Sequence, residues 1–194
     1  LALYAYDPTP DDLGPENLLR QSIELVARFP LIVANAYAVN RHFLSNKSLY
    51  IHNPKASLSV AENFLRMVRK DKSYTPEEAR LLDLMLILHA EHGGGNNSTF
   101  ACRAVSSTGT DTYSAIAAAV ASLKGPLHGG ANTKVMHQFA DIKEHVRHLD
   151  NDGELRDYLT KLLDGAAGDG SGKIYGLGHA VYTLSDPRAE MIKE

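Results

Sequence analysis

Three histidines lie at glycine-rich interruptions of an otherwise helical sequence. His92 opens HGGGNNST, His128 lies in SLKGPLHGGANTK, and His179 lies in YGLGHAVY, nine residues before Arg188. Each histidine alone is more simply a hydrogen-bonded residue at a helix end. Together they suggest chemistry, because histidine donates hydrogen bonds to carbonyl oxygens that gain negative charge and arginine binds a carboxylate bidentately. The set predicts a site for a small substrate that carries carboxylate groups.

Other motifs in the chain resemble phosphate-binding, dinucleotide-binding or zinc-binding motifs but lack residues that such sites need. GDGSGK lacks the first glycine of a phosphate-binding loop and has Ile174 where that loop needs serine or threonine. GLGHAV has neither the third glycine nor the preceding strand of a dinucleotide site. HAEH and the pair His145 and His148 lack the zinc-protease spacing His-Glu-x-x-His. We therefore predict no metal site, and a metal-dependent hydrolase is a distant alternative.

Helix-start signals recur along the chain. Ser59 with Glu62, and Thr75 with Glu78, have the spacing of a capping box, and Asp111 precedes an alanine-rich run. Further runs at helical spacing cover 131–146 and 153–165, whereas alternating strand patterns are scarce. The predicted fold class is all-α.

Several elements need individual predictions. Pro15 opens a helix that Pro30 is expected to end, with a second helix after it. The run Leu81–Leu88 is apolar on almost every side and is predicted to be buried. The small residues of Tyr113–Leu123 allow close helix packing, within one subunit or in a dimer. The stretch 164–186 contains six glycines and is predicted to be a loop shaped for ligand or backbone contact.

Composition limits the class of protein. The chain has 194 residues, 44% hydrophobic and 22% charged, with a net charge of −3 and a pI near 6.3. These values are typical of a soluble globular protein and do not suggest a nucleic-acid partner. No signal peptide is recognised, no apolar run approaches the roughly 20 residues of a membrane span, and the single Cys102 fits a reducing compartment. The predicted location is cytoplasmic.

Three segments carry a family resemblance. LHAEHGGGNNSTFACR, SLKGPLHGGAN and GLGHAVYTLSDPRA resemble the citrate synthase family in their motifs, order and separation. The resemblance covers essentially the whole chain. It implies a multi-helical fold and the condensation of acetyl-CoA with oxaloacetate to give citrate and CoA, by a Claisen-type step followed by thioester hydrolysis. It also implies a homodimer, no metal and no bound redox cofactor.

The resemblance assigns roles to individual residues. His128 is similar to the residue that binds the thioester carbonyl and stabilises the enol of acetyl-CoA, and its glycines would let the thioester approach. Ser98 is similar to the serine that orients this histidine. His179 is similar to the donor that polarises the oxaloacetate ketone, and His92 and Arg188 are similar to oxaloacetate ligands.

Two further groups follow from the same resemblance. Asn96 is expected to support the site from the same loop as Ser98. One segment falls where the family contacts the adenine part of CoA: Lys173, Ile174, Tyr175, Gly176, Leu177 and Gly178. Thr183 departs from the family, in which many members have lysine or arginine near the CoA phosphates.

The resemblance also implies that the sequence is a fragment. The catalytic aspartate of the family and two substrate-binding arginines are expected beyond Glu194, so we expect residues 1–194 alone to be inactive. Residues 1–127 would belong to the large helical domain and residues 128–194 to an incomplete small domain. Two alternatives stay open: a 2-methylcitrate synthase that uses propionyl-CoA, and a non-catalytic helical interaction domain.

Overall fold

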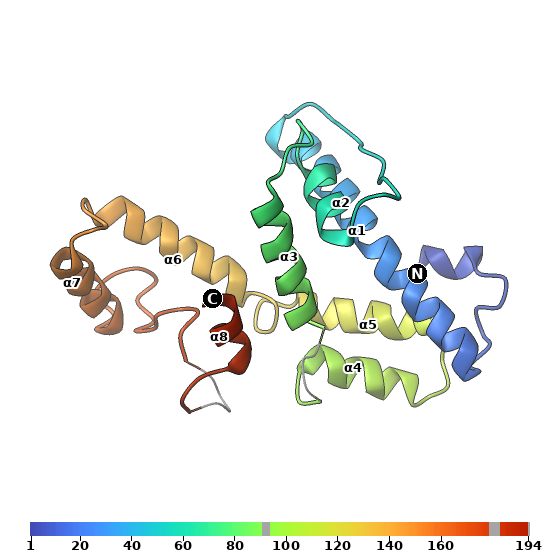
Figure 1. The fold of residues 1–194 in the computed structure, drawn as a ribbon. Helices are drawn as coiled ribbons and strands as arrows, with labels where there is room; N and C mark the ends of the chain where they lie inside the picture. Colours follow the sequence, from blue (N-terminus) through green and yellow to red (C-terminus); the bar gives the residue numbers. More distant parts are fainter. Residues whose placement is uncertain (91–93, 179–182, 194) are drawn as a thin grey trace.

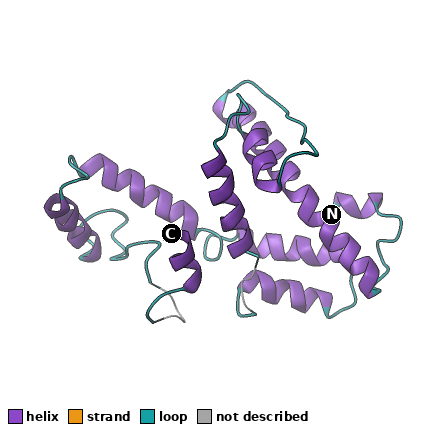
Figure 2. Cartoon of the chain, viewed as in Figure 1, coloured by secondary structure: helices purple, strands orange, loops and turns teal. Residues whose placement is uncertain are grey.

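The computed structural model describes residues 1–90, 94–178 and 183–193. Within these ranges every regular element is a helix, as Figure 1 and Figure 2 show. The all-α prediction is therefore confirmed.

The longest helix, α1 (Pro15–Ser45), runs through Pro30 and follows the short 3-10 helix η1 (Ala2–Tyr6). The prediction that Pro30 ends the helix is wrong. Proline removes one backbone hydrogen bond and costs about 3 kcal/mol inside a helix. Burial on both sides of the proline, at Leu25 before it and at Ala34 after it, keeps the helix continuous.

Three predicted helix starts are confirmed, each with a capping residue directly before the helix. Ser59 before α2 (Val60–Val68) and Thr75 before α3 (Pro76–Leu88) each form a complete capping box. Asp111 accepts a hydrogen bond from the Ser114 N–H at 2.9 Å, at the start of α5 (Thr112–Lys124). Each cap satisfies N–H groups that the helix itself leaves without partners.

Helices α4 (Asn97–Ser106) and α5 form an antiparallel pair, side by side in Figure 1. Residues 107–111 connect them, so the start of α4 lies beside the end of α5. A hydrogen bond from the Asn97 side-chain amide to the Ser122 hydroxyl, 2.7 Å long, joins these two ends. This pairing brings the loop before α4 next to the loop after α5.

A second group of helices follows: α6 (Ala131–His145), α7 (Asp152–Leu163) and α8 (Pro187–Lys193). Figure 1 shows α6 and α7 to one side of α1–α5, while α8 contacts α3. The core between α6 and α7 consists of Ile142, Val146, Tyr158 and Leu162. The proposed domain boundary at residues 127 and 128 stays a prediction.

Helix α3 is not buried as the sequence predicted. Ala79 is its buried residue, whereas Leu81 is 49% and Ile87 63% exposed. The helix packs against α2 and α8, which cover only part of its apolar circumference. Burial depends on neighbours from elsewhere in the chain, and an apolar pattern alone does not supply them.

The surface of the chain is large for its mass. The accessible area is 13996 Å², whereas a compact monomer of this mass is expected to expose roughly 9,000 Å². The excess includes apolar side chains on α1, α3, α5 and α6, among them Val26, Leu86, Val120 and Met136. The described helices therefore leave apolar faces without a covering layer from this chain.

By length and composition alone, α1 could cross a membrane, and among the described helices it is the one that meets this criterion. Its most apolar 18-residue window has a mean hydropathy of 1.3 and is 17% buried. The sequence reading, which divided this segment at Pro30, found no such run. Apolar core helices of soluble proteins meet the same criterion, and α1 packs against α2 and α5.

A buried polar network ties η1 to α1 and α5. The Asp7 carboxylate accepts hydrogen bonds from the Tyr113 hydroxyl at 2.6 Å, the Arg20 guanidinium at 2.7 Å and the Gln21 amide at 3.0 Å. Gln21 is fully buried, and its side-chain oxygen accepts from the Thr112 hydroxyl. These bonds hold the N-terminal segment against α1 and against α5, the helix that leads into the turn at His128.

This network predicts a pH dependence of stability. The Tyr113 hydroxyl, with the Thr9 N–H, Arg20 and Gln21, holds the pKa of Asp7 well below its usual range. The stabilisation is therefore present above the ordinary carboxyl pKa of about 4 and is lost as pH falls below it. In urea unfolding of the full-length gene product, Asp7→Asn is expected to lower the midpoint at pH 7.

The difference between Asp7→Asn and the wild type should then shrink between about pH 5 and pH 3. Asp150→Asn, which changes an exposed carboxylate in the loop before α7, is the control. An Asp7→Asn difference that stays constant over this pH range would show that the carboxylate charge does not stabilise the fold.

Candidate functional site

His128 lies in a tight turn after α5. Gly125 ends the helix in an extended conformation, as a residue before proline prefers, and its carbonyl accepts from the His128 and Gly129 N–H groups at 3.0 and 2.9 Å. The turn leads directly into α6. The half-buried imidazole is thus presented at the junction of two helices.

The N-terminal end of α4 holds this imidazole from the other side. The Ser98 backbone N–H donates to His128 Nε2 at 3.2 Å. Asn96 caps α4 by accepting from the Ser98 N–H at 3.0 Å and from the Ser98 hydroxyl at 2.6 Å. The structure therefore brings together Asn96, Ser98 and His128, which the sequence analysis had grouped.

This contact determines which nitrogen of His128 carries the proton. A backbone N–H can only donate, so Nε2 must be the acceptor. In the neutral imidazole the proton is then on Nδ1. His128 can consequently donate one hydrogen bond, through Nδ1–H, to an oxygen atom of a substrate.

The glycines beside His128 are needed for the chain's own packing. A Cβ atom at Gly129 would overlap the Leu123 carbonyl oxygen, and one at Gly130 would overlap the Pro126 carbonyl oxygen. Both obstacles are backbone atoms, which cannot rotate away. Approach of a thioester, which the sequence analysis gave as the reason for these glycines, stays a prediction beside this steric requirement.

In its described residues, 164–178 and 183–186, the glycine-rich stretch has neither helix nor strand, as predicted. Its six glycines all have positive φ, between 62° and 89°. The segment Lys173–Gly178 lies against α6, where the Gln138 side chain bonds to the backbone on both sides of Ile174. A pocket of about 330 Å³ between α6 and this loop is lined partly by Gln138 and Tyr175.

Arg188 lies at the start of α8, near the C-terminal end of the described chain. Its guanidinium bonds to the Asp186 carboxylate through Nε at 3.0 Å and through an Nη nitrogen at 2.7 Å. The geometry is the bidentate one expected for binding a carboxylate, and here the carboxylate belongs to the chain itself. A carboxylate from a ligand would have to share or displace this partner.

Two predicted site residues, His92 and His179, lie outside the described residues. The structure therefore groups Asn96, Ser98 and His128 on the α4–α5 side. The segment Lys173–Gly178 lies against α6. Arg188 belongs to α8.

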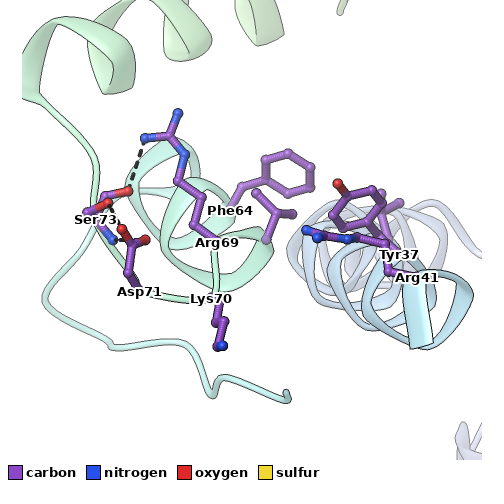
Figure 3. Close-up of a pocket in the computed structure, with 9 residues that line it drawn as sticks. Tyr37, Arg41, Phe64, Arg69, Lys70, Asp71 and Ser73 are labelled. Carbon is purple, nitrogen blue, oxygen red and sulfur yellow. Dashed lines mark hydrogen bonds between the residues drawn. The ribbon is translucent and has the colours of Figure 1, made fainter. Parts of the chain in front are cut away.

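A further pocket lies away from this site, between α1, α2 and the segment after α2. It has a volume of about 860 Å³, and Figure 3 shows Tyr37 and Arg41 on one side of it and Phe64 on the other. Arg69 at its edge is held by Glu78 in a bidentate pair at 2.6 and 2.8 Å. None of the predicted site residues lines this pocket, so we do not take it as the candidate site.

Metal-ligating side chains are not grouped in the part of the chain that the structure describes. There, no cluster of three or more histidine, cysteine, aspartate or glutamate residues could hold a metal ion. His145 and His148, a spacing that could suggest a metal pair, have other partners. His145 stacks on Tyr158 and bonds to the Asp141 carbonyl, and His148 bonds to Glu154.

Comparison with known proteins gives a consistent result. The family model described as citrate synthase, C-terminal domain, matches residues 1–194. Citrate synthase of Deinococcus radiodurans is 39% identical over 97% of this chain and 45% of its own length. Citrate synthase 2 of Bacillus subtilis is 38% identical over 97% of this chain and 45% of its own length. 2-Methylcitrate synthase 1 of Corynebacterium glutamicum is 35% identical over 97% of this chain and 46% of its own length.

A solved structure agrees with these sequence matches. The crystal structure of citrate synthase from Thermotoga maritima superposes with a TM-score of 0.66 and 31% identity, over 92% of this chain and 44% of that one. The fold and site define an all-α protein whose helix junctions carry a histidine-based site. This chain belongs to the citrate synthase family, and it spans less than half the length of the relatives it matches.

Some residues at the site were not singled out from the sequence. Asn97 joins α4 to Ser122 of α5, and Gln138 anchors the loop at Lys173 and Tyr175. Gln138 lies 35 residues before Lys173, so no local spacing could reveal the contact. Asn97 stands in the quoted GGGNNST motif, and the polarity of that loop was its one available signal.

The cap at Asn96 yields a prediction. Asn96→Ala removes the acceptor that orients Ser98, so we expect a loss of about 1 kcal/mol of helix stability and a lower kcat. Asn96→Asp keeps an acceptor oxygen and is expected to stay close to the wild type in both. Thermal unfolding and steady-state kinetics of the full-length variants measure these effects. An alanine variant as active as the wild type would show that the cap does not position Ser98.

Proposed function

We propose that the protein containing this chain is a citrate synthase, which condenses acetyl-CoA with oxaloacetate to give citrate and CoA. The observation that carries the proposal is the hydrogen bond from the Ser98 N–H to His128 Nε2 at 3.2 Å. It leaves Nδ1–H as a directed donor in a turn that belongs to a motif of the family. Such a donor suits the thioester carbonyl of acetyl-CoA, whose oxygen gains negative charge in the transition state as the α-proton is removed.

The other residues are proposed to bind and polarise the second substrate. Arg188 presents a bidentate donor surface for a carboxylate, now facing Asp186. His179 and His92 are proposed, from their motifs, to hydrogen-bond the ketone and carboxylate groups of oxaloacetate. The segment Lys173–Gly178 is proposed to contact the adenine part of CoA.

We further propose a cytoplasmic homodimer without a resident metal or redox cofactor. The exposed apolar residues of α3 and α5, such as Ile87 and Val120, support an interface that uses these helices. The chemistry assigned to His128, His179 and Arg188 needs hydrogen-bond donors and no electron transfer. A chelator should therefore leave the rate unchanged.

Thiol release from acetyl-CoA by the full-length gene product tests the function. We expect release that depends on oxaloacetate and is faster with acetyl-CoA than with propionyl-CoA. No release with either thioester would favour a non-catalytic helical domain that retained the motifs. That domain would also show no oxaloacetate binding by calorimetry.

A 2-methylcitrate synthase is the second candidate function. The observation that favours it is the match to 2-methylcitrate synthase 1 of Corynebacterium glutamicum, 35% identical over 193 residues. The same site could serve both thioesters, because one methylene group is worth only about 1–3 kcal/mol of discrimination. A higher kcat/KM with propionyl-CoA in the same assay would establish this alternative.

A further inference from the structure

One side chain of α6 bonds to the backbone of the loop 164–186 twice. The Gln138 Nε2 donates to the Lys173 carbonyl at 2.9 Å, and its Oε1 accepts from the Tyr175 N–H at 2.9 Å. A carbonyl only accepts and a backbone N–H only donates, so this orientation of the amide is the one that satisfies both partners. Gln138 thus pairs with the backbone on both sides of Ile174, much as a neighbouring strand would.

The segment has little other regular backbone support. It has neither helix nor strand structure, and its own bond, from the Leu177 N–H to the Ile174 carbonyl, is long at 3.4 Å. Gly176 and Gly178 have φ of 89° and 84°, a region that glycine enters freely, so the unanchored chain would have many conformations. An external anchor is therefore needed to hold one conformation.

Tyr175 supplies a second anchor at the same place. Its hydroxyl donates to Asp169 at 2.6 Å and accepts from the Lys134 ammonium at 3.0 Å. The Lys134 nitrogen also lies 4.7 Å from the centre of the Tyr175 ring. This anchor fixes the side chain of Tyr175, whereas Gln138 fixes the backbone on either side of Ile174.

We propose that Gln138 is a positioning residue that pre-forms the segment Lys173–Gly178 for the CoA thioester. The inference rests on the proposed function, because the ligand of this segment is taken from it. Gln138 touches no substrate in this scheme and acts only through the backbone it holds. Ordering the loop before binding removes an entropic cost from binding, so its effect belongs in the affinity for the thioester.

Steady-state kinetics of full-length Gln138→Leu test this role. Loss of both hydrogen bonds is expected to raise KM for acetyl-CoA about tenfold. The kcat and the KM for oxaloacetate should stay within about twofold. Gln138→Glu still accepts from the Tyr175 N–H but cannot donate to the Lys173 carbonyl, so its KM should be intermediate. Lys143→Ala, at an exposed position further along α6, is the control and should match the wild type.

Hydrogen exchange separates this inference from the proposed function. The Tyr175 amide should be protected in the wild type and should exchange at least tenfold faster in Gln138→Leu, whether or not the protein turns over acetyl-CoA. Equal exchange in the two proteins would overturn the positioning role. The role would also be overturned by a Gln138→Leu variant that melts like the wild type and keeps its KM for acetyl-CoA. The same holds for a variant whose kcat falls while both KM values rise. Failure of the wild type to release thiol would overturn the proposed function alone.

Discussion

Replacing His128 by alanine in the full-length gene product is expected to lower kcat for oxaloacetate-dependent thiol release by about 10²–10⁴-fold. The Nδ1–H of His128 is the donor proposed for the thioester carbonyl, and its strength matters most when that oxygen carries negative charge. The proposed binding of oxaloacetate does not use this nitrogen. The KM for oxaloacetate should therefore change by less than about threefold.

His128→Asn separates the donor role from a packing role. The asparagine amide places an N–H close to the position of Nδ1, so this variant should keep more activity than His128→Ala. His148→Ala, which removes an imidazole that is 70% exposed, should behave like the wild type. Wild-type kcat in a folded His128→Ala protein would show that this histidine does not take part in the chemistry.

The parts of the fold that were predicted correctly are those that depend on neighbours in sequence. A cap such as Ser59 or Asp111 bonds to the N–H three residues later, so the residue type and its spacing carry most of the information. The glycines between residues 165 and 178 are similar, because a positive φ is a property of the residue and its immediate backbone.

Predictions that depended on distant parts of the chain were wrong or could not be made. Pro30 was expected to end a helix, but packing around Leu25 and Ala34 outweighs the local cost of the proline. The run Leu81–Leu88 was expected to be buried, and the described helices cover it only in part. An apolar pattern shows which side chains favour burial but does not name the surface that buries them.

The candidate site shows the same division. His128 and Ser98 were both named through the resemblance to a family, whereas the contact between them, across 30 residues, is made by the α4–α5 pair and uses the Ser98 backbone N–H. The choice of Nδ1 as the proton-carrying nitrogen needed the geometry, because it depends on one backbone N–H. The anchoring of Lys173 by Gln138 had no local signal.

The second large effect is expected at a residue without a side chain. Gly129→Ala would place a Cβ atom into the Leu123 carbonyl oxygen, and because both are backbone-bound the whole turn must shift. The shift would stretch the bonds from His128 and Gly129 to the Gly125 carbonyl, and the contact between His128 and Ser98. Overpacking of this kind costs about 1–3 kcal/mol of stability.

The same shift should also lower the catalytic rate. Misplacing a reacting group by about 1 Å can lower the rate about 10²-fold, so we expect kcat of Gly129→Ala to fall by that factor while the protein remains folded. Gly95→Ala is the matched control: it lies in the loop before α4, has no positive φ, and its added Cβ would meet no described atom within 4 Å. It should keep kcat within about twofold.

If Gly129→Ala also retained the wild-type kcat, the turn would tolerate the displacement, and the steric account of this glycine would be wrong. Equal loss of activity in both variants would mean that the backbone flexibility of glycine is what matters. Both variants lose a glycine, but only Gly129→Ala adds a Cβ atom where there is no space for it.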